Sequence, residues 1–322
     1  MSRALPGCKN AVAISLFAVL LPCWAAAADV PAGYAAEDSA PLLEEIIITA
    51  PEPRYVSPTR RDRIGRIWAP VFINEKGPFR LVLDTGASHS GISAEVAAKL
   101  GLEPKRSDRA RLLGVTGSAV VGMVNVDSLV VGDMALRGKR LPIITDPLGG
   151  AEGILGSEGL TDKRVYIDFR NDFIRINRSK GERAADSFIT IPVKFARGKL
   201  LTVDARIGNL PITAIIDTGA EVTIANIAAR DAMSLQDNNN FTIDRIQGAT
   251  ADIQEGERHR TPAITIGNIV IRTQRLTFID LHIFKHWKMT EEPALLIGMD
   301  ALGLLDTLVI DYRRAELHMK MR

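Results

Sequence analysis

The chain has 322 residues, of which 40 are Lys or Arg and 38 are Asp or Glu, so the formal net charge is 40 − 38 = +2. This balance supplies no basic field for nucleic acid, and a hydrophobic share of 46% beside a charged share of 24% indicates an ordinary globular protein with a sizeable core. Collagen-like, coiled-coil and polytopic membrane proteins are excluded, and the length is sufficient for two domains.

Residues 1–28 are predicted to form a secretory signal peptide, so we expect an exported protein, periplasmic or secreted. Arg3 and Lys9 give the segment a positive start, an apolar run follows at 11–21, and small residues at 25–28 offer cleavage sites. An uncleaved membrane anchor is an alternative, because the uncharged run is marginally long enough to span a bilayer.

Two further interpretations of this segment have less support. Pro22 stands before Cys23, where a lipoprotein signal needs a small residue, and the Ala-rich tail is poor material for a buried core helix. Cys8 and Cys23 are the two cysteines of the chain. The remainder can therefore form no disulfide and no thiolate metal site.

Residues 29–62 are predicted to be a linker or pro-segment, because Pro, Ala, Glu and Ser dominate and little periodic apolar surface is present. Within it, Glu44–Ala50 has the β-branched density of a strand that adds to a sheet edge. We expect this strand to dock on the body of the protein itself. As an alternative, it resembles the energy-coupling box of outer-membrane TonB-dependent transporters, although no barrel-length sequence follows.

An internal repeat determines the architecture of the remainder. An apolar run that ends in an acid, a hydroxyl residue, glycine and alanine occurs twice, with its acids 217 − 84 = 133 residues apart. Two later landmarks recur in the same order, namely two apolar residues before a glycine and then a closing strand. The three pairs are Phe79–Ala87 with Ile212–Ala220, Gly153–Gly156 with Leu295–Gly298, and Val165–Arg170 with Leu308–Arg313.

Strand-like runs between these landmarks predict an all-β body with a few short helices. We expect a two-lobed fold with pseudo-two-fold symmetry, an N-terminal lobe over residues 63–180 and a C-terminal lobe over residues 181–322. The strand runs are Val120–Val131, Leu200–Ile207, Ala263–Ile271 and Leu276–Ile279, and the helix-compatible stretches are Ala94–Leu100 and Ile224–Met233.

The repeated acids, Asp84 and Asp217, are the centre of the predicted chemistry. An isolated carboxylate after a buried strand is costly, and two at equivalent positions of a repeat are expected to meet where the lobes join. Two carboxyl groups that close cannot both ionise, so they share one proton. One group can then take a proton from a water that attacks a carbonyl, while the other protonates the carbonyl oxygen.

These residues also carry a family resemblance over residues 63–322. Asp84–Ser88 and Asp217–Glu221, followed by Ile154–Gly156 and Leu296–Gly298, are similar to the two signatures of a bilobal aspartic protease with retroviral-type, retropepsin-like lobes, here of a bacterial-type exported kind. The resemblance implies a catalytic pair acting on a bound water, with threonines holding the two loops together and glycines letting amides approach the acids. The implied residues are Asp84, Thr85, Gly86, Asp217, Thr218 and Gly219.

The resemblance further implies a glycine-rich hairpin flap over the substrate in each lobe. Leu112–Ser118 and Ile246–Thr250 lie at the corresponding distances, and neither has the tyrosine of the pepsin branch. The flap residues would be Gly114, Val115, Gly117, Gly248 and Ala249. No cofactor and no metal are expected.

Other interpretations remain open for each motif. An acid–Thr–Gly turn can be a structural Asx-turn, and the flap glycines can be ordinary hairpin residues. His282 and His286 have a spacing that can ligate a metal, but no third ligand is evident. Ser88 and Ser90 flank His89 without the context of a nucleophile elbow.

The sequence therefore predicts an aspartic endopeptidase that cleaves an extended peptide or protein held between its lobes. One chain supplies both acids, so a monomer is expected, with no nucleic-acid partner and a possible association with the cell envelope. The alternatives are a non-catalytic module on the same fold that binds a peptide or an envelope component, and an accessory of an outer-membrane transport system that works through residues 44–50.

Overall fold

The computed structural model describes residues 44–47, 68–145, 150–171, 173–196, 200–236, 240–248, 250, 252–272 and 275–321. The predicted signal peptide, most of the predicted linker and Ala249 lie outside these residues, so the expectations for them stay predictions. Within the described part of the chain, no helix has both the length and the apolar character needed to cross a membrane.

The N-terminal half forms an eight-stranded sheet in the order β1-β5-β6-β2-β3-β8-β4-β7. Because β6 also pairs with β7, six of these strands close into a ring without free edges, and β5 and β1 extend from it. The strands are β1 (Glu44–Ile47), β2 (Trp68–Ile73), β3 (Lys76–Leu83), β4 (Gly91–Ser93), β5 (Arg109–Leu113), β6 (Ser118–Val131), β7 (Met134–Ile144) and β8 (Gly153–Leu155).

Burial along these strands follows their pleat. In β2 every second residue is buried, so one side faces the core. In β3 the alternation ends and Leu81–Leu83 is buried throughout, because this part of the strand lies between β2 and β8. The buried end of β3 leads directly into Asp84.

The predicted helix at Ala94–Leu100 is confirmed as α1 (Ala94–Leu100). Ser93 Oγ accepts a hydrogen bond from the Val96 amide at 3.1 Å, which satisfies one of the free amides of the first turn. Gly101 ends the helix at φ 74°, a left-handed conformation that glycine adopts without strain.

The C-terminal half forms a ten-stranded sheet with the corresponding order β16-β17-β20-β15-β21-β14-β13-β18-β19, to which β12 is added beside β13. Its strands are β12 (Lys194–Ala196), β13 (Leu200–Ile207), β14 (Leu210–Ile216), β15 (Ile224–Ala225), β16 (Thr242–Gln247), β17 (Ile253–His259), β18 (Ile264–Ile266), β19 (Ile269–Ile271), β20 (Leu276–Phe278) and β21 (Ala294–Ile297). The helices are α2 (Ile227–Ala232), α3 (His282–His286) and α4 (Met299–Leu302).

Two sequence predictions need correction here. The run Ala263–Ile271 is not one strand but the hairpin β18–β19. The stretch Ile224–Met233 is helical only as α2, since Ile224 and Ala225 pair with both β20 and β21 as strand β15. Asn226 then caps the helix by accepting a hydrogen bond from the Ala229 amide at 3.0 Å.

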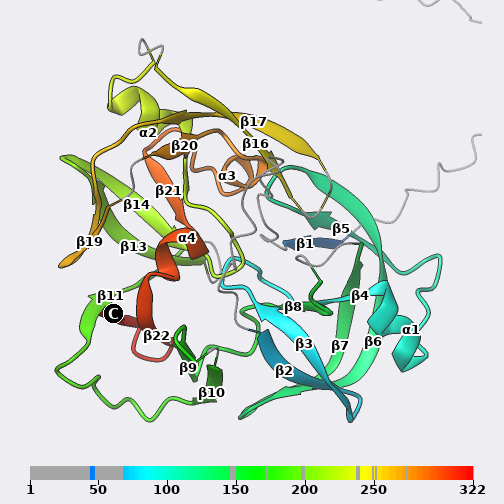
Figure 1. The fold of residues 1–322 in the computed structure, drawn as a ribbon. Helices are drawn as coiled ribbons and strands as arrows, with labels where there is room; N and C mark the ends of the chain where they lie inside the picture. Colours follow the sequence, from blue (N-terminus) through cyan, green and yellow to red (C-terminus); the bar gives the residue numbers. More distant parts are fainter. Residues whose placement is uncertain are drawn as a thin grey trace, which may run out of the picture. The chain divides into compact units, whose positions relative to one another are not determined.

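A third sheet joins the two halves. Its five strands run in the order β10-β9-β22-β23-β11, with β9 (Lys163–Asp168), β10 (Phe173–Arg178), β11 (Ile189–Pro192), β22 (Leu305–Asp311) and β23 (Glu316–Met321). The closing strands of the two repeats, β9 and β22, pair antiparallel at its centre, from Asp168 opposite Thr307 to Arg164 opposite Asp311. Figure 1 shows β9, β10 and β22 together, away from β5 and β16.

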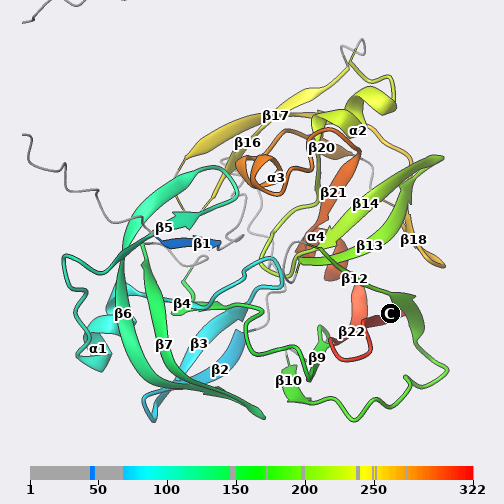
Figure 2. The same cartoon turned by 180° about the vertical axis from the view of Figure 1, so that it is seen from behind.

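The two-lobed all-β fold is thereby confirmed. The predicted boundary after residue 180 separates strands that share this third sheet, and the largest hydrophobic cluster includes Leu81, Ile167, Leu308 and Ile216. The lobes therefore have one continuous core. Figure 2 shows the protein from the opposite side. In this view β5 and β16 lie at the end opposite to β9, β10 and β22.

Candidate active site

The site begins where β3 and β14 end. β3 runs parallel to β8, and β14 runs parallel to β21, so each acid follows a strand held by the second signature of its own lobe. The Asp84 amide donates to the Leu155 carbonyl at 2.9 Å, and the Asp217 amide donates to the Ile297 carbonyl at 3.0 Å. Both aspartates are completely buried.

The glycine of each second signature permits a close approach. A side-chain carbon at Gly156 would lie 2.5 Å from the backbone of His89, and one at Gly298 would lie 2.7 Å from the backbone of Val222. Such contacts are too short for any side chain, so glycine is required where the strand crosses behind the acidic loop.

Two hydroxyl residues that sequence reasoning missed hold this crossing in place. The Gly156 amide donates to Ser90 Oγ at 3.1 Å, and the Gly298 amide donates to Thr223 Oγ1 at 3.2 Å. A signal was present, since 223 − 90 gives the same 133-residue offset that separates the two acids.

Thr85 and Thr218 connect the two acidic loops by four hydrogen bonds that cross between the lobes. The Thr85 hydroxyl donates to the Ile216 carbonyl at 2.6 Å and accepts from the Thr218 amide at 3.1 Å. In return, the Thr218 hydroxyl donates to the Leu83 carbonyl at 2.7 Å and accepts from the Thr85 amide at 3.2 Å. The exchange is symmetric, and it fixes the ends of β3 and β14 against each other.

Each acid is bound by the amides of its own turn. Asp84 Oδ1 accepts from the Gly86 amide at 2.8 Å and the Ala87 amide at 2.9 Å. Asp217 Oδ1 accepts from the two amides of its own turn, Gly219 at 2.9 Å and Ala220 at 3.1 Å. These bonds fix one oxygen of each carboxyl group in place.

The pKa of Asp84 shows how strongly the two acids affect each other. Burial and the charge of Asp217 hold the pKa of Asp84 well above the ordinary carboxyl range, against the opposing effect of the Ala87 and Gly86 amides. Two buried carboxyl groups that raise each other's pKa cannot both ionise without a large cost, so the pair is expected to hold one proton between them.

Tyr312 is a further residue close to the acids that the sequence analysis did not single out. Its ring is buried and stacks on Phe195 at 5.8 Å between centroids. Burial and the charge of Asp84 both raise the pKa of Tyr312, so its phenol stays neutral. Phe169 occupies the matching place in the other closing strand, so the phenol is confined to one lobe.

Of the predicted flap residues that the structure describes, Gly114, Val115 and Gly117 lie at the tip of the hairpin β5–β6, and Gly248 lies at the tip of the hairpin β16–β17. The Gly248 amide donates to Thr116 Oγ1 at 3.0 Å, so the tips meet. Val115 is 1% exposed and belongs to a hydrophobic cluster of the C-terminal lobe that includes Ile283 and Phe284. Its carbonyl accepts from the Ile283 amide at 3.3 Å.

The remaining sequence candidates take no part in this arrangement. His282 and His286 lie on α3, where Phe284 and Trp287 are buried as packing residues. Among the described residues, no cluster of three or more His, Cys, Asp or Glu side chains is suited to a metal. Ser88 Oγ and His89 Nδ1 are 2.9 Å apart as sequence neighbours.

The fold and the site together define a two-lobed, all-β protein in which symmetric turns place two buried carboxyl groups side by side. The model of the aspartyl protease family matches residues 69–158 and 203–301, one stretch in each lobe. These stretches make up more than half of the chain, which therefore belongs to the aspartyl protease family.

Comparisons with individual proteins show only distant similarity. No curated protein matches the chain. An aspartic proteinase from Irpex lacteus of known crystal structure is similar at a TM-score of 0.48 and 12% sequence identity, over 80% of this chain and 95% of that chain.

Proposed function

We propose that this protein is an exported, bacterial-type aspartic endopeptidase that hydrolyses peptide bonds with a water held between Asp84 and Asp217. The observation that carries the proposal is the pair of completely buried carboxyl groups on equivalent turns, since a pair that keeps one proton contains an acid and a base side by side. The symmetric bonds of Thr85 and Thr218 support it, because they fix both loops without using the carboxyl oxygens of the pair.

In the proposed mechanism Asp84, whose pKa is held above the ordinary carboxyl range, is the acid and Asp217 is the base. Asp217 takes a proton from the water as the water oxygen attacks the peptide carbonyl, and Asp84 gives its proton to the carbonyl oxygen. The tetrahedral intermediate then collapses as Asp217 returns its proton to the leaving nitrogen. Asp84 recovers a proton from a hydroxyl of the intermediate, so the C–N bond breaks and the pair returns to its starting state.

An extended peptide substrate is supported by the edges of the two hairpins. The outer edge of β5 takes β1 as a parallel neighbour, with Glu44 opposite Ala110 and Ile47 opposite Leu113, so this edge accepts an extended segment. In the other lobe, β16 is the terminal strand of its sheet. A substrate would use such edges through its backbone. One chain supplies both halves of the site, so we propose that it acts as a monomer.

The test is a digest of a random peptide library with the mature protein, scanned across pH. Cleavage is expected for the unchanged protein, with a loss of about a thousandfold in Asp84→Asn and in Asp217→Asn. Asp204→Asn is the matched control, because the Asp204 side chain is 80% exposed and forms an ion pair with Lys194 on the surface.

Two results would contradict the proposal. If the folded protein retains peptides without cleaving them, and both active-site variants retain them equally, the protein is a binding module on this fold. If either variant fails to fold, as judged by circular dichroism, the turn has a structural role, and the Asp84→Glu and Asp217→Glu variants then test the chemistry separately.

A further inference from the structure

A basic pocket lies beside the sheet that joins the lobes. It is a cavity of about 630 Å³ formed by β9, β10, the segment that follows β10, and the turn between β22 and β23. We call it the basic pocket because six cationic side chains line it, namely Arg164, Arg175, Arg178, Lys180, Arg183 and Arg313. None of these residues belongs to the acidic loops or the hairpins.

The positive charge of the basic pocket is not cancelled by its neighbours. Two acids, Asp133 and Glu182, also line it, and two more lie against its arginines: Asp311 is 3.7 Å from Arg164, and Asp162 is 3.5 Å from Arg178. Six cations and four acids leave a local excess of 6 − 4 = +2. The basic pocket therefore favours an anionic ligand.

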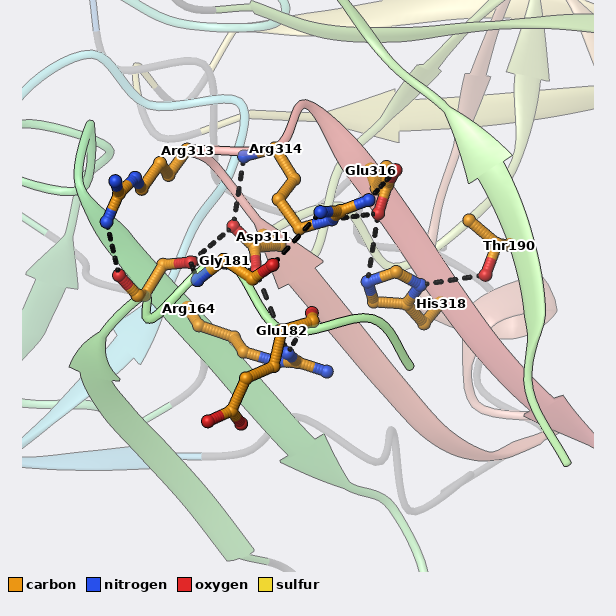
Figure 3. A network of polar contacts seen from close by, with 10 residues as sticks. Arg164, Gly181, Glu182, Thr190, Asp311, Arg313, Arg314, Glu316 and His318 are labelled. Atoms are coloured by element: carbon orange, nitrogen blue, oxygen red, sulfur yellow. Dashed lines mark hydrogen bonds and ion pairs between the residues drawn. The ribbon is translucent and has the colours of Figure 1, made fainter. Parts of the chain in front are cut away.

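Part of the basic pocket is held rigid by a buried network, drawn in Figure 3. Asp311 is completely buried, and Ser179 Oγ donates to both of its oxygens at 2.9 Å. Arg313 Nη1 donates to the Ser179 carbonyl at 3.1 Å, and Arg164 Nη1 donates to the backbone carbonyl of Glu182 at 3.1 Å. Both guanidinium groups are thus positioned, while each keeps further N–H groups for a ligand.

Other cations of the basic pocket remain available. Lys180 has no hydrogen bond or ion pair with any residue that the structure describes, and Arg183 affects Glu316 only through its charge. Arg175 lies over the ring of Phe173 at 5.1 Å. These side chains are exposed, so they can turn toward a ligand without breaking an ion pair.

The number and type of cations identify the ligand. A single carboxylate would engage one or two arginines and leave the others unpaired, whereas a phosphate group offers three strong acceptors and up to two charges. The planar guanidinium fork also matches phosphate oxygens in a bidentate manner. We propose that the basic pocket binds an anion that carries more than one phosphate group, either a soluble compound or a phosphorylated lipid headgroup.

Titration calorimetry of the mature protein with sodium tripolyphosphate tests this proposal, at a salt concentration of about 50 mM to limit screening. We expect binding at one site, weakened about tenfold or more in the double variant Lys180→Gln and Arg183→Gln. Lys105→Gln with Arg106→Gln is the matched control, because it removes the same charge from exposed residues outside the basic pocket.

Vesicles distinguish the two sources of phosphate. Sedimentation with vesicles that contain cardiolipin, a lipid with two phosphate groups, would assign a lipid headgroup if the pocket variant abolishes it, and binding of tripolyphosphate without sedimentation would assign a soluble compound. The proposal is overturned if tripolyphosphate does not bind up to about 1 mM, if the control variant weakens binding equally, or if polyglutamate binds as tightly as tripolyphosphate. Peptide cleavage is not part of this measurement, so the proposed function is tested independently.

Discussion

The hairpins β5–β6 and β16–β17 share a topology but differ in how they are supported. In the N-terminal lobe, β6 runs unbroken for 14 residues and pairs with β5, β2 and β7. In the C-terminal lobe, the same course is divided between β17 and β18. Pro262 lies in the break, where its lack of an amide hydrogen removes a ladder bond. β19 and β20 likewise replace the continuous β7.

The hairpins also differ at their tips and edges. Val115 of the first is buried in the opposite lobe, whereas Ile243 and Ile253 of the second are 55% and 46% exposed. The first has β1 along its edge, and the second ends its sheet at β16. The two halves of the repeat are therefore symmetric at the loops of Asp84 and Asp217 and asymmetric at the hairpins β5–β6 and β16–β17. The N-terminal hairpin is anchored, and the C-terminal hairpin presents an apolar open edge.

The largest expected effect is on the pH dependence of cleavage, which tests whether the N-terminal lobe supplies the acid of the pair. Because the pKa of Asp84 is raised, cleavage should fall about tenfold for each pH unit above that pKa, as Asp84 loses the proton that it donates. A pH profile of kcat measures this limb. A rate that stays constant well into the alkaline range would contradict the assignment of the acid to the N-terminal lobe.

The same proton can be followed through the stability of the protein, in a measurement that does not require catalytic activity. A carboxyl group with a raised folded-state pKa stabilises the fold fully below its unfolded pKa of about 3.9 and loses this contribution as the pH rises through the folded value. Asp84→Asn does not titrate, so its unfolding free energy relative to the unchanged protein should increase with pH over that window. Urea unfolding at several pH values checks the sign.

The hydrogen bonds of Thr85 and Thr218, in contrast to the two acids, should contribute equally to the free energy of unfolding. Thr85→Val and Thr218→Val each leave a buried amide and a buried carbonyl without their partner, so each is expected to lower the unfolding free energy by about 2–3 kcal/mol. Thr85→Ser and Thr218→Ser keep the hydroxyl and serve as controls. Unequal losses in urea unfolding would show that the symmetric bonds do not contribute symmetrically.

The anchoring of the first hairpin is tested by a pair of truncations. Val115→Ala removes two buried methyl groups and should destabilise the protein by about 1.5 kcal/mol. Ile253→Ala on the second hairpin should change stability by less than about 0.5 kcal/mol, because the side chain is largely exposed. Similar losses from both in thermal unfolding would remove the distinction between an anchored and an open hairpin.

The smallest effect concerns the strand on the edge of β5. A chain that starts at residue 51 lacks β1, so a peptide no longer competes with it for this edge, and KM should fall on the order of fivefold with little change in kcat. The control replaces Ile46 and Ile47 by Val, which keeps a strand-forming sequence. An unchanged KM in the truncated protein would show that peptides do not use the edge of β5.

The repeat allowed much of the site to be predicted from sequence. Asp84 and Asp217 with their threonines were found because the same short pattern occurs twice in register, and α1 was found because the stretch Ala94–Leu100 is compatible with a helix. Ser90 and Thr223 were missed, although they follow the same offset. A lone hydroxyl residue in a loop gives no signal until its partner amide is known.

Other features depend on tertiary contacts that local patterns do not encode. The burial of Val115 is determined by Ile283, which lies far away in sequence. The pairing of β9 with β22 joins the two closing strands across the repeat, and nothing in either strand alone indicates its partner. The run Ala263–Ile271 has the apolar character of one strand, but a turn at Gly267 and Asn268 divides it into β18 and β19.

The ladder between β9 and β22 restricts how the site can open. A hinge rotation of one lobe away from the other would shear five consecutive register pairs at the floor of the protein, together with the continuous core around them. The tip of the N-terminal hairpin, by contrast, is joined to the C-terminal half by the buried side chain of Val115 and by single hydrogen bonds from Gly248 and from Ile283 of α3. An extended peptide should therefore enter and leave through movement of the hairpins β5–β6 and β16–β17, while the two lobes keep a fixed position relative to each other.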